Sequence, residues 1–351
     1  ELLRHLEAPG CRAAPAFLRA LAPVPGEDIA AAFRRSLAPG APPARPLPPV
    51  SADSATRRHV CPAPGCIKAY SSAHCLYIHK RNHHPHLINA RRCPPAPAGE
   101  VVIEHQAIGI NFIDIYIRTG AYPWPVDGNL ILGSEGAGVV TAVGEGVSHV
   151  AVGDRVGYTL PNGAYATHRA INADLVVKLP DGISSEVAAA IMLKGLTVAY
   201  LLNDSYAVKP GDTVLFHAAA GGVGLLAGQW LKSIGATAIG TAGGAEKCAL
   251  AAAHGFDHVI DYRSEDVPAR VMEITGGAGA DVAYDSVGKD TFAGTLASLR
   301  RHGTAVAFGQ SSGPYSDFKI ADLGKGSLHL TRPTLFHFAT VRSWLESATE
   351  K

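Results

Sequence analysis

The sequence predicts an α/β protein in which a β-rich module precedes a doubly wound parallel sheet. Three observations predict this organisation. From about residue 183, short apolar strands alternate with helical patterns, an order typical of a parallel sheet covered by helices. Between about residues 100 and 182, short β segments are punctuated by glycine. Before residue 99 the composition changes to a basic, proline-rich one, which predicts a separate segment.

Composition narrows the class of protein. The chain has 351 residues, of which 47% are hydrophobic and 17% charged, so most of it can bury a core. No apolar run reaches the roughly 18 residues that span a bilayer, and the first residues lack the basic and apolar regions of a secretory signal. We therefore expect a cytoplasmic protein that makes no membrane contact.

Residues 1–98 differ from the rest of the chain in charge. They carry 13 Lys and Arg against 5 Asp and Glu, with 16 of the 24 prolines and five of the six cysteines. The other residues carry 18 against 25, and their single cysteine, Cys248, excludes a disulfide framework there. Such asymmetry predicts two parts with different roles. Residues 1–56, with a proline-rich spacer at 38–50, receive no functional assignment.

Residues 57–88 contain a spacing typical of a zinc site, C-x4-C-x12-H-x3-H. Its four members are Cys61, Cys66, His79 and His83. Zinc takes four such ligands in a tetrahedron, and a ββα unit supplies them at this spacing. Tyr70 and Leu76 stand where the small core of such a unit needs apolar side chains. The pattern resembles a C2H2 zinc finger over about residues 59–84 and predicts one structural Zn²⁺.

Sequence-specific DNA recognition by this finger is not expected. The helix positions that would face bases hold Ser72, Cys75 and Ile78, which lack the bidentate donors that discriminate bases. One finger also reads only about 3 bp. The neighbouring Lys and Arg side chains predict at most a weak, sequence-independent attraction to phosphates. A nuclear location would follow only if the finger functions.

A glycine-rich bend joins the strand TVLFHAAA to the next helix. It reads AAGGVG from residue 219, a G-x-G-x-x-G fingerprint with Ala in the first glycine position. The predicted cofactor-binding residues of this bend are Ala220, Gly221, Gly222, Val223 and Gly224. Gly221 would let the backbone approach a pyrophosphate, Gly224 would allow close packing of helix on strand, and the helix N-terminus supplies free N–H groups.

The next strand indicates which dinucleotide binds. It ends near residues 241–244 without the Asp or Glu that would accept hydrogen bonds from a ribose 2′-hydroxyl. Small residues including Gly243 stand there, and Lys247 follows one turn into the helix. A cation at this place favours a 2′-phosphate, hence NADPH. From its position alone, Lys247 could equally be a solvated helix lysine.

From about residue 94 to the end, the sequence resembles the quinone oxidoreductase (zeta-crystallin-like) branch of the medium-chain dehydrogenase/reductase family. The matching stretches include AIGINFIDIYIRTGAYP, LGSEGAGVVTAVGEGV, VLFHAAAGGVGLLAGQWLKSIGA and KGSLHLTRPTL. The resemblance implies a GroES-like module over 94–185 and a Rossmann-type NADP-binding domain over 186–351. It also implies an NADPH-dependent reductase of quinones or, as a close variant, of α,β-unsaturated carbonyls. The edge strand at Ser327–Leu335 would pair two copies into a homodimer.

The resemblance assigns further residues. The expected catalytic residues, which line the cleft near the nicotinamide, are Asn111, Tyr116 and Tyr122. Either tyrosine could hydrogen-bond a quinone oxygen or simply form the pocket wall, and Asp114 would orient their loop. The expected cofactor contacts are Lys194 and Thr197 near the phosphates and nicotinamide amide, Lys247 and Tyr262 at the 2′-phosphate, and Phe308 and Gln310 beside the nicotinamide.

The resemblance also predicts no catalytic metal. Zinc-containing relatives have Cys where this chain has Asn111, and His before Glu where it has Ser134 before Glu135. Their four-cysteine structural loop is missing as well. A thiolate and an imidazole are therefore both replaced by weaker ligands, and hydride transfer would depend on positioning and electrostatics.

Two rival hypotheses stay open at this level. Family members begin with a further strand pair before the position of Pro94 and continue past that of Lys351, so the GroES-like module is expected to be incomplete. The protein could then be a catalytically impaired adaptor that binds nucleic acid or protein. It could also be a fused or truncated gene product, a reading motivated by the start at Glu1 instead of Met.

Overall fold

The computed structural model describes residues 59–60, 69–70, 95–123 and 130–350. The four predicted zinc ligands, Cys61, Cys66, His79 and His83, lie outside these described residues, and so do residues 1–58. In the part before residue 95, the structure describes two short antiparallel strands, β1 (His59–Val60) and β2 (Ala69–Tyr70). They flank the positions of both predicted cysteine ligands.

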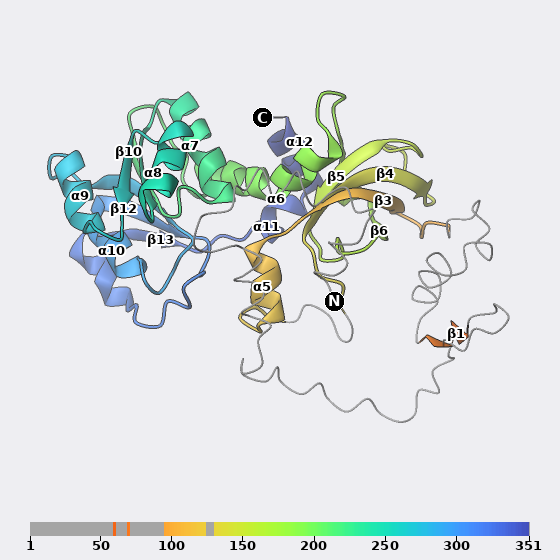
Figure 1. Ribbon diagram of the computed structural model, residues 1–351, viewed down its shortest axis with the longest axis horizontal. Helices are drawn as coiled ribbons and strands as arrows, with labels where there is room; N and C mark the ends of the chain where they lie inside the picture. The colour runs from red at the N-terminus through yellow and green to blue at the C-terminus, as the bar shows by residue number, and fades with distance from the viewer. Residues whose placement is uncertain (1–58, 61–68, 71–94, 124–129, 351) are drawn as a thin grey trace.

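An antiparallel sheet of five strands forms one lobe of the protein (Figure 1), in the order β6-β3-β4-β5-β7. Its strands are β3 (Glu100–Gly109), β4 (Glu135–Val143), β5 (Arg155–Thr159), β6 (His168–Asn172) and β7 (Val176–Lys178). The predicted β-rich module is thereby confirmed. Burial does not alternate at the start of β3, where Val101, Val102 and Ile103 are all buried. A register shift against β4 between Val102 and Ile103 interrupts the alternation.

A parallel sheet of six strands forms the second lobe, in the order β10-β9-β8-β11-β12-β13. Its strands are β8 (Thr213–Phe216), β9 (Thr237–Ala242), β10 (His258–Asp261), β11 (Ala280–Asp285), β12 (Leu299–Ala307) and β13 (His329–Thr331). The chain starts in the middle of the sheet, moves to one edge, and then returns to build the other half. This order is that of a dinucleotide-binding doubly wound sheet, as predicted.

Helices cover both faces of the parallel sheet. Side chains of α7 (Gly222–Ile234) and α8 (Ala245–Ala253) share one buried cluster with Val214 and Phe216 of β8. Side chains of α9 (Val267–Ile274) and α10 (Phe292–Ala297) share another with Leu215. Adjacent residues of β8 therefore point to opposite cores, which explains why this strand is a continuous apolar run.

Helix α6 (Ser185–Tyr200) runs between the two lobes (Figure 1) and continues as the π-helical turn η3 (Leu201–Ser205). Residues 185–205 are long and apolar enough to cross a membrane by length and composition, although polar residues such as Lys194 interrupt them. Of this apolar stretch, 67% is buried inside the protein, as is typical of a core helix. Leu196 and Tyr200 pack in the same cluster as Phe216.

The remaining described elements are short helices. They are α5 (Phe112–Arg118), η2 (Ala173–Leu175), η4 (Ile320–Lys325), α11 (Phe336–Ala339) and α12 (Arg342–Thr349). Arg342 at the start of α12 donates to the Asp174 carbonyl oxygen at 3.2 Å, so the chain returns to the five-stranded sheet. Helix α5 was not predicted, because seven residues are too few to show a helical period. The Asn111-x-x-Asp114 capping pattern was the available signal.

Replacing Gly228 by Ala is expected to cost about 1 to 3 kcal/mol of unfolding free energy, whereas Gly195→Ala is expected to stabilise by up to about 1 kcal/mol. A Cβ on Gly228 would lie 2.6 Å from the His254 carbonyl oxygen and 2.7 Å from a ring carbon of Phe256. A Cβ on Gly195 would meet nothing within 4 Å. Urea unfolding measures both changes, and an equal effect of the two variants would contradict the packing of α7.

Candidate active site

The turn after β3 carries the first candidate residue, Asn111, into a buried cluster of polar groups. A Cβ on Gly109 would overlap both the Glu135 Oε1 atom and the Ala189 carbonyl oxygen, so only glycine fits where β3 passes Glu135. Asn111 then precedes the first turn of α5, and its backbone N–H donates to Asp114 Oδ2 at 3.0 Å. The short helix begins at this bond, which fixes the direction in which Asn111 points.

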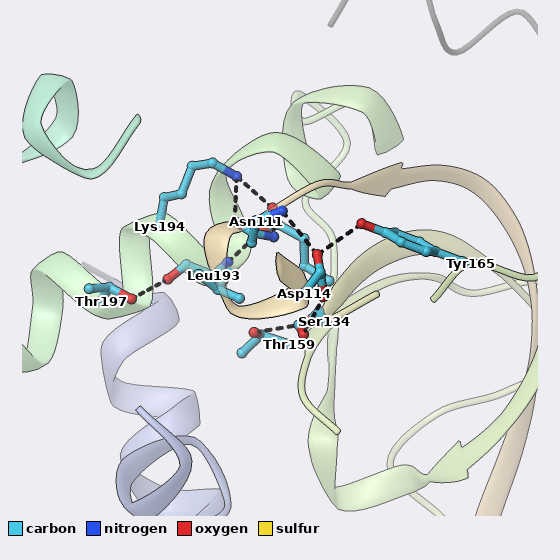
Figure 2. A network of polar contacts seen from close by, with 9 residues as sticks. Asn111, Asp114, Ser134, Thr159, Tyr165, Leu193, Lys194 and Thr197 are labelled. Carbon is cyan, nitrogen blue, oxygen red and sulfur yellow. Dashed lines mark hydrogen bonds and ion pairs between the residues drawn. The ribbon is translucent and has the colours of Figure 1, made fainter. Parts of the chain in front are cut away.

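Glu135 is the centre of the cluster, and its side chain is 0% exposed. Lys194 Nζ lies 2.6 Å from Oε1, and Asn111 Nδ2 donates to Oε1 at 2.9 Å. Lys194, Asn111 and Leu193 are labelled in Figure 2. The backbone N–H of Leu193 donates to Oε2 at 2.7 Å. Lys194 Nζ also donates to Asn111 Oδ1 at 3.0 Å. A buried carboxylate is tolerated when a cation and further donors satisfy it, as here.

Asp114 is the acceptor of a second group of hydrogen bonds near Asn111 (Figure 2). Its carboxylate accepts from Ser134 Oγ at 3.0 Å and from the Tyr165 hydroxyl at 2.9 Å. Burial raises the pKa of Asp114 above its usual range, although the hydrogen bond from Tyr165 and the others oppose this change. Burial also raises the pKa of Tyr165, which keeps that hydroxyl protonated as a donor. Asp114 thus ties α5 to β4 and to the loop before β6.

The two candidate tyrosines lie together and face the parallel sheet. The rings of Tyr116 and Tyr122 have centroids 4.9 Å apart. The backbone N–H of Gln310, three residues beyond the end of β12, donates to the Tyr116 hydroxyl at 3.3 Å. Arg332 donates to the Tyr122 hydroxyl and to the Ala307 carbonyl oxygen, both at 3.0 Å. Burial raises the pKa of Tyr116, so its phenol stays protonated.

The glycine-rich bend between β8 and α7 offers an uncapped helix N-terminus. Gly221 is the N-cap residue, its position has no side-chain cap, and the first turn contains no acidic residue. A Cβ on Gly224 would lie 2.5 Å from the carbonyl oxygens of Ala218 and Ala219, so glycine is required for α7 to pack here. A Cβ on Gly222 would lie 2.9 Å from Lys194 Cδ. Free N–H groups and a nearby ammonium suit a phosphate.

The ends of β9 and β10 form a second candidate anion site. A Cβ on Gly243 would lie 2.6 Å from the Tyr262 hydroxyl and 3.1 Å from Arg263 Nε, so both side chains lie against this turn. Gly244 has a positive φ of 88° and donates its N–H to Asp261 Oδ1 at 2.9 Å. Lys247 follows in the first turn of α8. Tyr262 and Arg263 therefore lie against this turn, Lys247 stands in the first turn of the helix that follows it, and the Asp261 carboxylate accepts the Gly244 N–H.

The other predicted contacts are placed as follows. Thr197 donates its hydroxyl to the Leu193 carbonyl oxygen at 2.7 Å, inside its own helix. Phe308 directly follows β12, and its ring centroid lies 5.9 Å from that of Phe216.

The sequence analysis missed three residues that have contacts at these sites: Glu135, Arg263 and Arg332. Arg263 was detectable as a cation next to Tyr262, whereas the other two depend on partners distant in sequence. Among the described residues, no group of three or more His, Cys, Asp and Glu is arranged to hold a metal ion.

Comparison with known proteins identifies the family. Residues 97–181 match the alcohol dehydrogenase GroES-like domain, and residues 222–350 match the zinc-binding dehydrogenase family. Quinone oxidoreductase of Salmonella typhimurium is 51% identical over 261 residues, which cover 74% of this chain and 80% of that protein. This chain belongs to the quinone oxidoreductase branch of the medium-chain dehydrogenase/reductase family. The predicted GroES-like and Rossmann-type domains are thereby confirmed.

Other members of the family extend the comparison. The crystal structure of Escherichia coli quinone oxidoreductase complexed with NADPH has a TM-score of 0.71 and 49% identity, covering 74% of this chain and 80% of that one. The 2-haloacrylate reductase of a Burkholderia species is 42% identical over 264 residues, covering 73% of this chain and 79% of that protein. The shared region corresponds to the two lobes that carry the candidate site.

Replacing Lys194 by Met is expected to cost about 3 to 5 kcal/mol of unfolding free energy, because Glu135 would be left as a buried charge without a cation. Adding Glu135→Gln should recover part of this loss by removing that charge. The control is Lys178→Met, whose ion pair with Asp154 has side chains 55% and 27% exposed and should contribute less than about 1 kcal/mol. Urea unfolding gives all three values, and equal losses at the two lysines would refute the burial argument.

Proposed function

We propose that this protein is an NADPH-dependent reductase that transfers hydride to quinones. The observation that carries the proposal is the identity of about half of the residues to quinone oxidoreductases across both lobes. The NADPH-bound relative shares this fold and 49% of its residues with this chain. The uncapped N-terminus of α7, next to a lysine stem and lined by glycines, suits the pyrophosphate of such a cofactor.

The chain's own residues would hold the cofactor in three places. The start of α7 would bind the pyrophosphate, with Ala220, Gly221, Gly222, Val223 and Gly224 closest and Lys194 adding positive charge. The turn at Gly243 would receive the 2′-phosphate, held by Lys247, Tyr262 and the added Arg263. Thr197, Phe308 and Gln310 would adjoin the nicotinamide, which supplies the hydride when bound.

Asn111, Tyr116 and Tyr122 are the proposed residues on the substrate side. The Tyr116 oxygen accepts the Gln310 N–H, which leaves its own O–H proton to donate. Such a donor would stabilise negative charge that develops on a quinone oxygen during reduction. Arg332 holds Tyr122 in the same way from the other side. Asn111 is oriented by Glu135 and Lys194, and so presents a fixed amide rather than a mobile one.

We propose that this chemistry proceeds without a catalytic metal. A matching family is described as zinc-binding, but the thiolate and imidazole of the zinc-containing relatives correspond here to Asn111 and Ser134. The Asn111 amide is engaged with Glu135 and Lys194, and the Ser134 hydroxyl donates to Asp114. An amide and a hydroxyl are poor zinc ligands, and these two already have other partners.

Reduction of an α,β-unsaturated carbonyl is the close alternative. It is favoured by the 42% identity to the 2-haloacrylate reductase, whose name describes an activated alkene as substrate. Both reactions place negative charge on an oxygen conjugated with the carbon that receives hydride. Because the same tyrosine donors would serve either substrate, the site does not distinguish the two reactions. Comparing kcat/KM for a quinone with kcat/KM for an enone does.

We further propose a homodimer and a zinc finger. Strand β13 lies at the edge of the six-stranded sheet, where Ser327–Leu335 could pair with the same segment of a second copy. Sedimentation of the purified chain tests this pairing.

The antiparallel β1–β2 pair supports a finger with Cys61, Cys66, His79 and His83 around one Zn²⁺. Loss of bound zinc in Cys61→Ser would support it, as would weak, salt-sensitive nucleic-acid binding that the same change abolishes. A cytoplasmic location accords with the free thiol of Cys248.

The decisive test of function is NADPH oxidation by the purified chain with a small quinone, with and without a zinc chelator. We expect formation of hydroquinone and NADP⁺ at a rate that the chelator does not change. A reaction without quinone controls for oxidation by dioxygen. Binding of NADPH without turnover would contradict the reductase and favour an adaptor, and inhibition by the chelator would contradict a metal-free reaction.

Replacing Lys247 by Ala is expected to raise the Kd for NADPH by about 10- to 100-fold, because a hydrogen bond to a charged group contributes about 1.5 to 3 kcal/mol. The Kd for NADH should change by less than about twofold, since NADH lacks the 2′-phosphate that this cation would contact. Nicotinamide fluorescence measures both constants. Lys232→Ala, in the last turn of α7, serves as the control. Equal weakening of both cofactors would show that Lys247 does not recognise the 2′-phosphate.

A further inference from the structure

A chain of buried hydrogen bonds runs beneath the glycine-rich bend and joins three strands of the parallel sheet. His217, directly after β8, has Nδ1 3.1 Å from Thr241 Oγ1 of β9. Its Nε2 lies 3.0 Å from Thr295 Oγ1 of α10, which donates to Asp285 Oδ2 of β11 at 2.7 Å. All four residues are at most 2% exposed. Neither the sequence motifs nor the proposed reaction accounts for this chain.

The donors in this chain can be assigned one by one. The Asp285 carboxylate accepts hydrogen bonds from two backbone N–H groups of the following turn, at 2.8 and 3.0 Å. Thr295 has one proton, and its shortest contact assigns that proton to Asp285. His217 Nε2 must then carry a proton that it donates to Thr295, and Nδ1 must accept from Thr241. Burial lowers the pKa of His217, against the raising effect of Asp285, so the ring is neutral at neutral pH.

The ring is anchored next to a strained residue. Ala218 follows His217 with a φ of 55°, in the left-handed region that residues with a Cβ adopt at a cost of about 1 to 2 kcal/mol. The Ala218 carbonyl oxygen accepts the N–H of Gly221 at 2.9 Å, and the N–H of Ala219 donates to the Thr241 carbonyl oxygen at 2.9 Å. The bend therefore begins with a strained residue held between fixed neighbours.

We propose that His217 is a positioning residue for cofactor binding. Held by Thr241 and Thr295, its ring keeps Ala218 in the left-handed conformation, so that the N–H groups at the start of α7 face the pyrophosphate. Thr241 also leads into the turn at Gly243, so the same chain aligns the two anion sites with each other. This inference rests on the proposed binding of NADPH and concerns the geometry of that site.

The test uses the full chain and two substitutions of one hydroxyl. Thr295→Val removes the hydroxyl at nearly constant shape, whereas Thr295→Ser keeps it. We expect Thr295→Val to raise the Kd for NADPH about tenfold, the equivalent of about 1.4 kcal/mol, and Thr295→Ser to leave it within about twofold. The control is Ser298→Ala, which removes a buried hydroxyl from the end of the same helix, where it bonds the Gly294 carbonyl oxygen at 2.8 Å. Its Kd should equal that of the parent.

A second substitution separates positioning from general destabilisation of the core. Glycine adopts the left-handed conformation freely, so Ala218→Gly should restore most of the NADPH affinity lost in Thr295→Val. Its effect on the melting temperature should be the same in Thr295→Val as in the parent, because the buried donor of His217 stays unpaired. Parental affinity in Thr295→Val, or no recovery with Ala218→Gly, would overturn the role of His217 while leaving the proposed function intact. A parent chain that does not bind NADPH would overturn both.

Discussion

The buried charge of Glu135 is the constraint on which the substrate side of the site depends. A carboxylate removed from water must receive a cation and several hydrogen bonds, or it becomes strongly destabilising. Here those groups come from two separate elements: the residue that caps α5, and helix α6, which supplies both the Leu193 N–H and the Lys194 ammonium. Gly109 leaves no space between β3 and this carboxylate. The position of α5, and with it Tyr116, follows from satisfying one charge.

The parallel sheet also contains a buried carboxylate, which a different set of donors stabilises. Asp285 is also fully buried at the end of a strand, but hydroxyl and backbone N–H donors surround it instead of an ammonium. Such donors are short and fixed to rigid elements, so they hold the following turn with little loss of side-chain entropy. Glu135 begins β4 and Asp285 ends β11, so each carboxylate stands at a junction between a strand and a turn. Each buried acid accepts donors from a neighbouring turn and so holds its shape: Glu135 from Asn111, and Asp285 from the N–H groups of Val287 and Gly288.

The sequence allowed prediction of whatever depends on local pattern. The strands and helices from β8 to β12 follow from apolar runs and helical spacing, and the bend at Gly221 follows from its glycines. Helix α5 could not be found by periodicity because it has two turns at most. Glu135 and Arg332 were missed because their partners are 59 and 210 residues away. No local pattern encodes such contacts. The four predicted zinc ligands stay a prediction, since they lie outside the described residues.

Lys194 has a structural contact that the sequence did not predict, beside the cofactor position that the resemblance implied. The resemblance placed it near the cofactor phosphates, whereas its ammonium contacts Glu135 and Asn111. Its stem nevertheless passes so close to the start of α7 that a Cβ on Gly222 would lie 2.9 Å from its Cδ. An ammonium that is 12% exposed acts over several ångströms in a low dielectric. Glu135 balances most of this charge, so a ligand phosphate at the helix N-terminus would compete with Glu135 for the same cation.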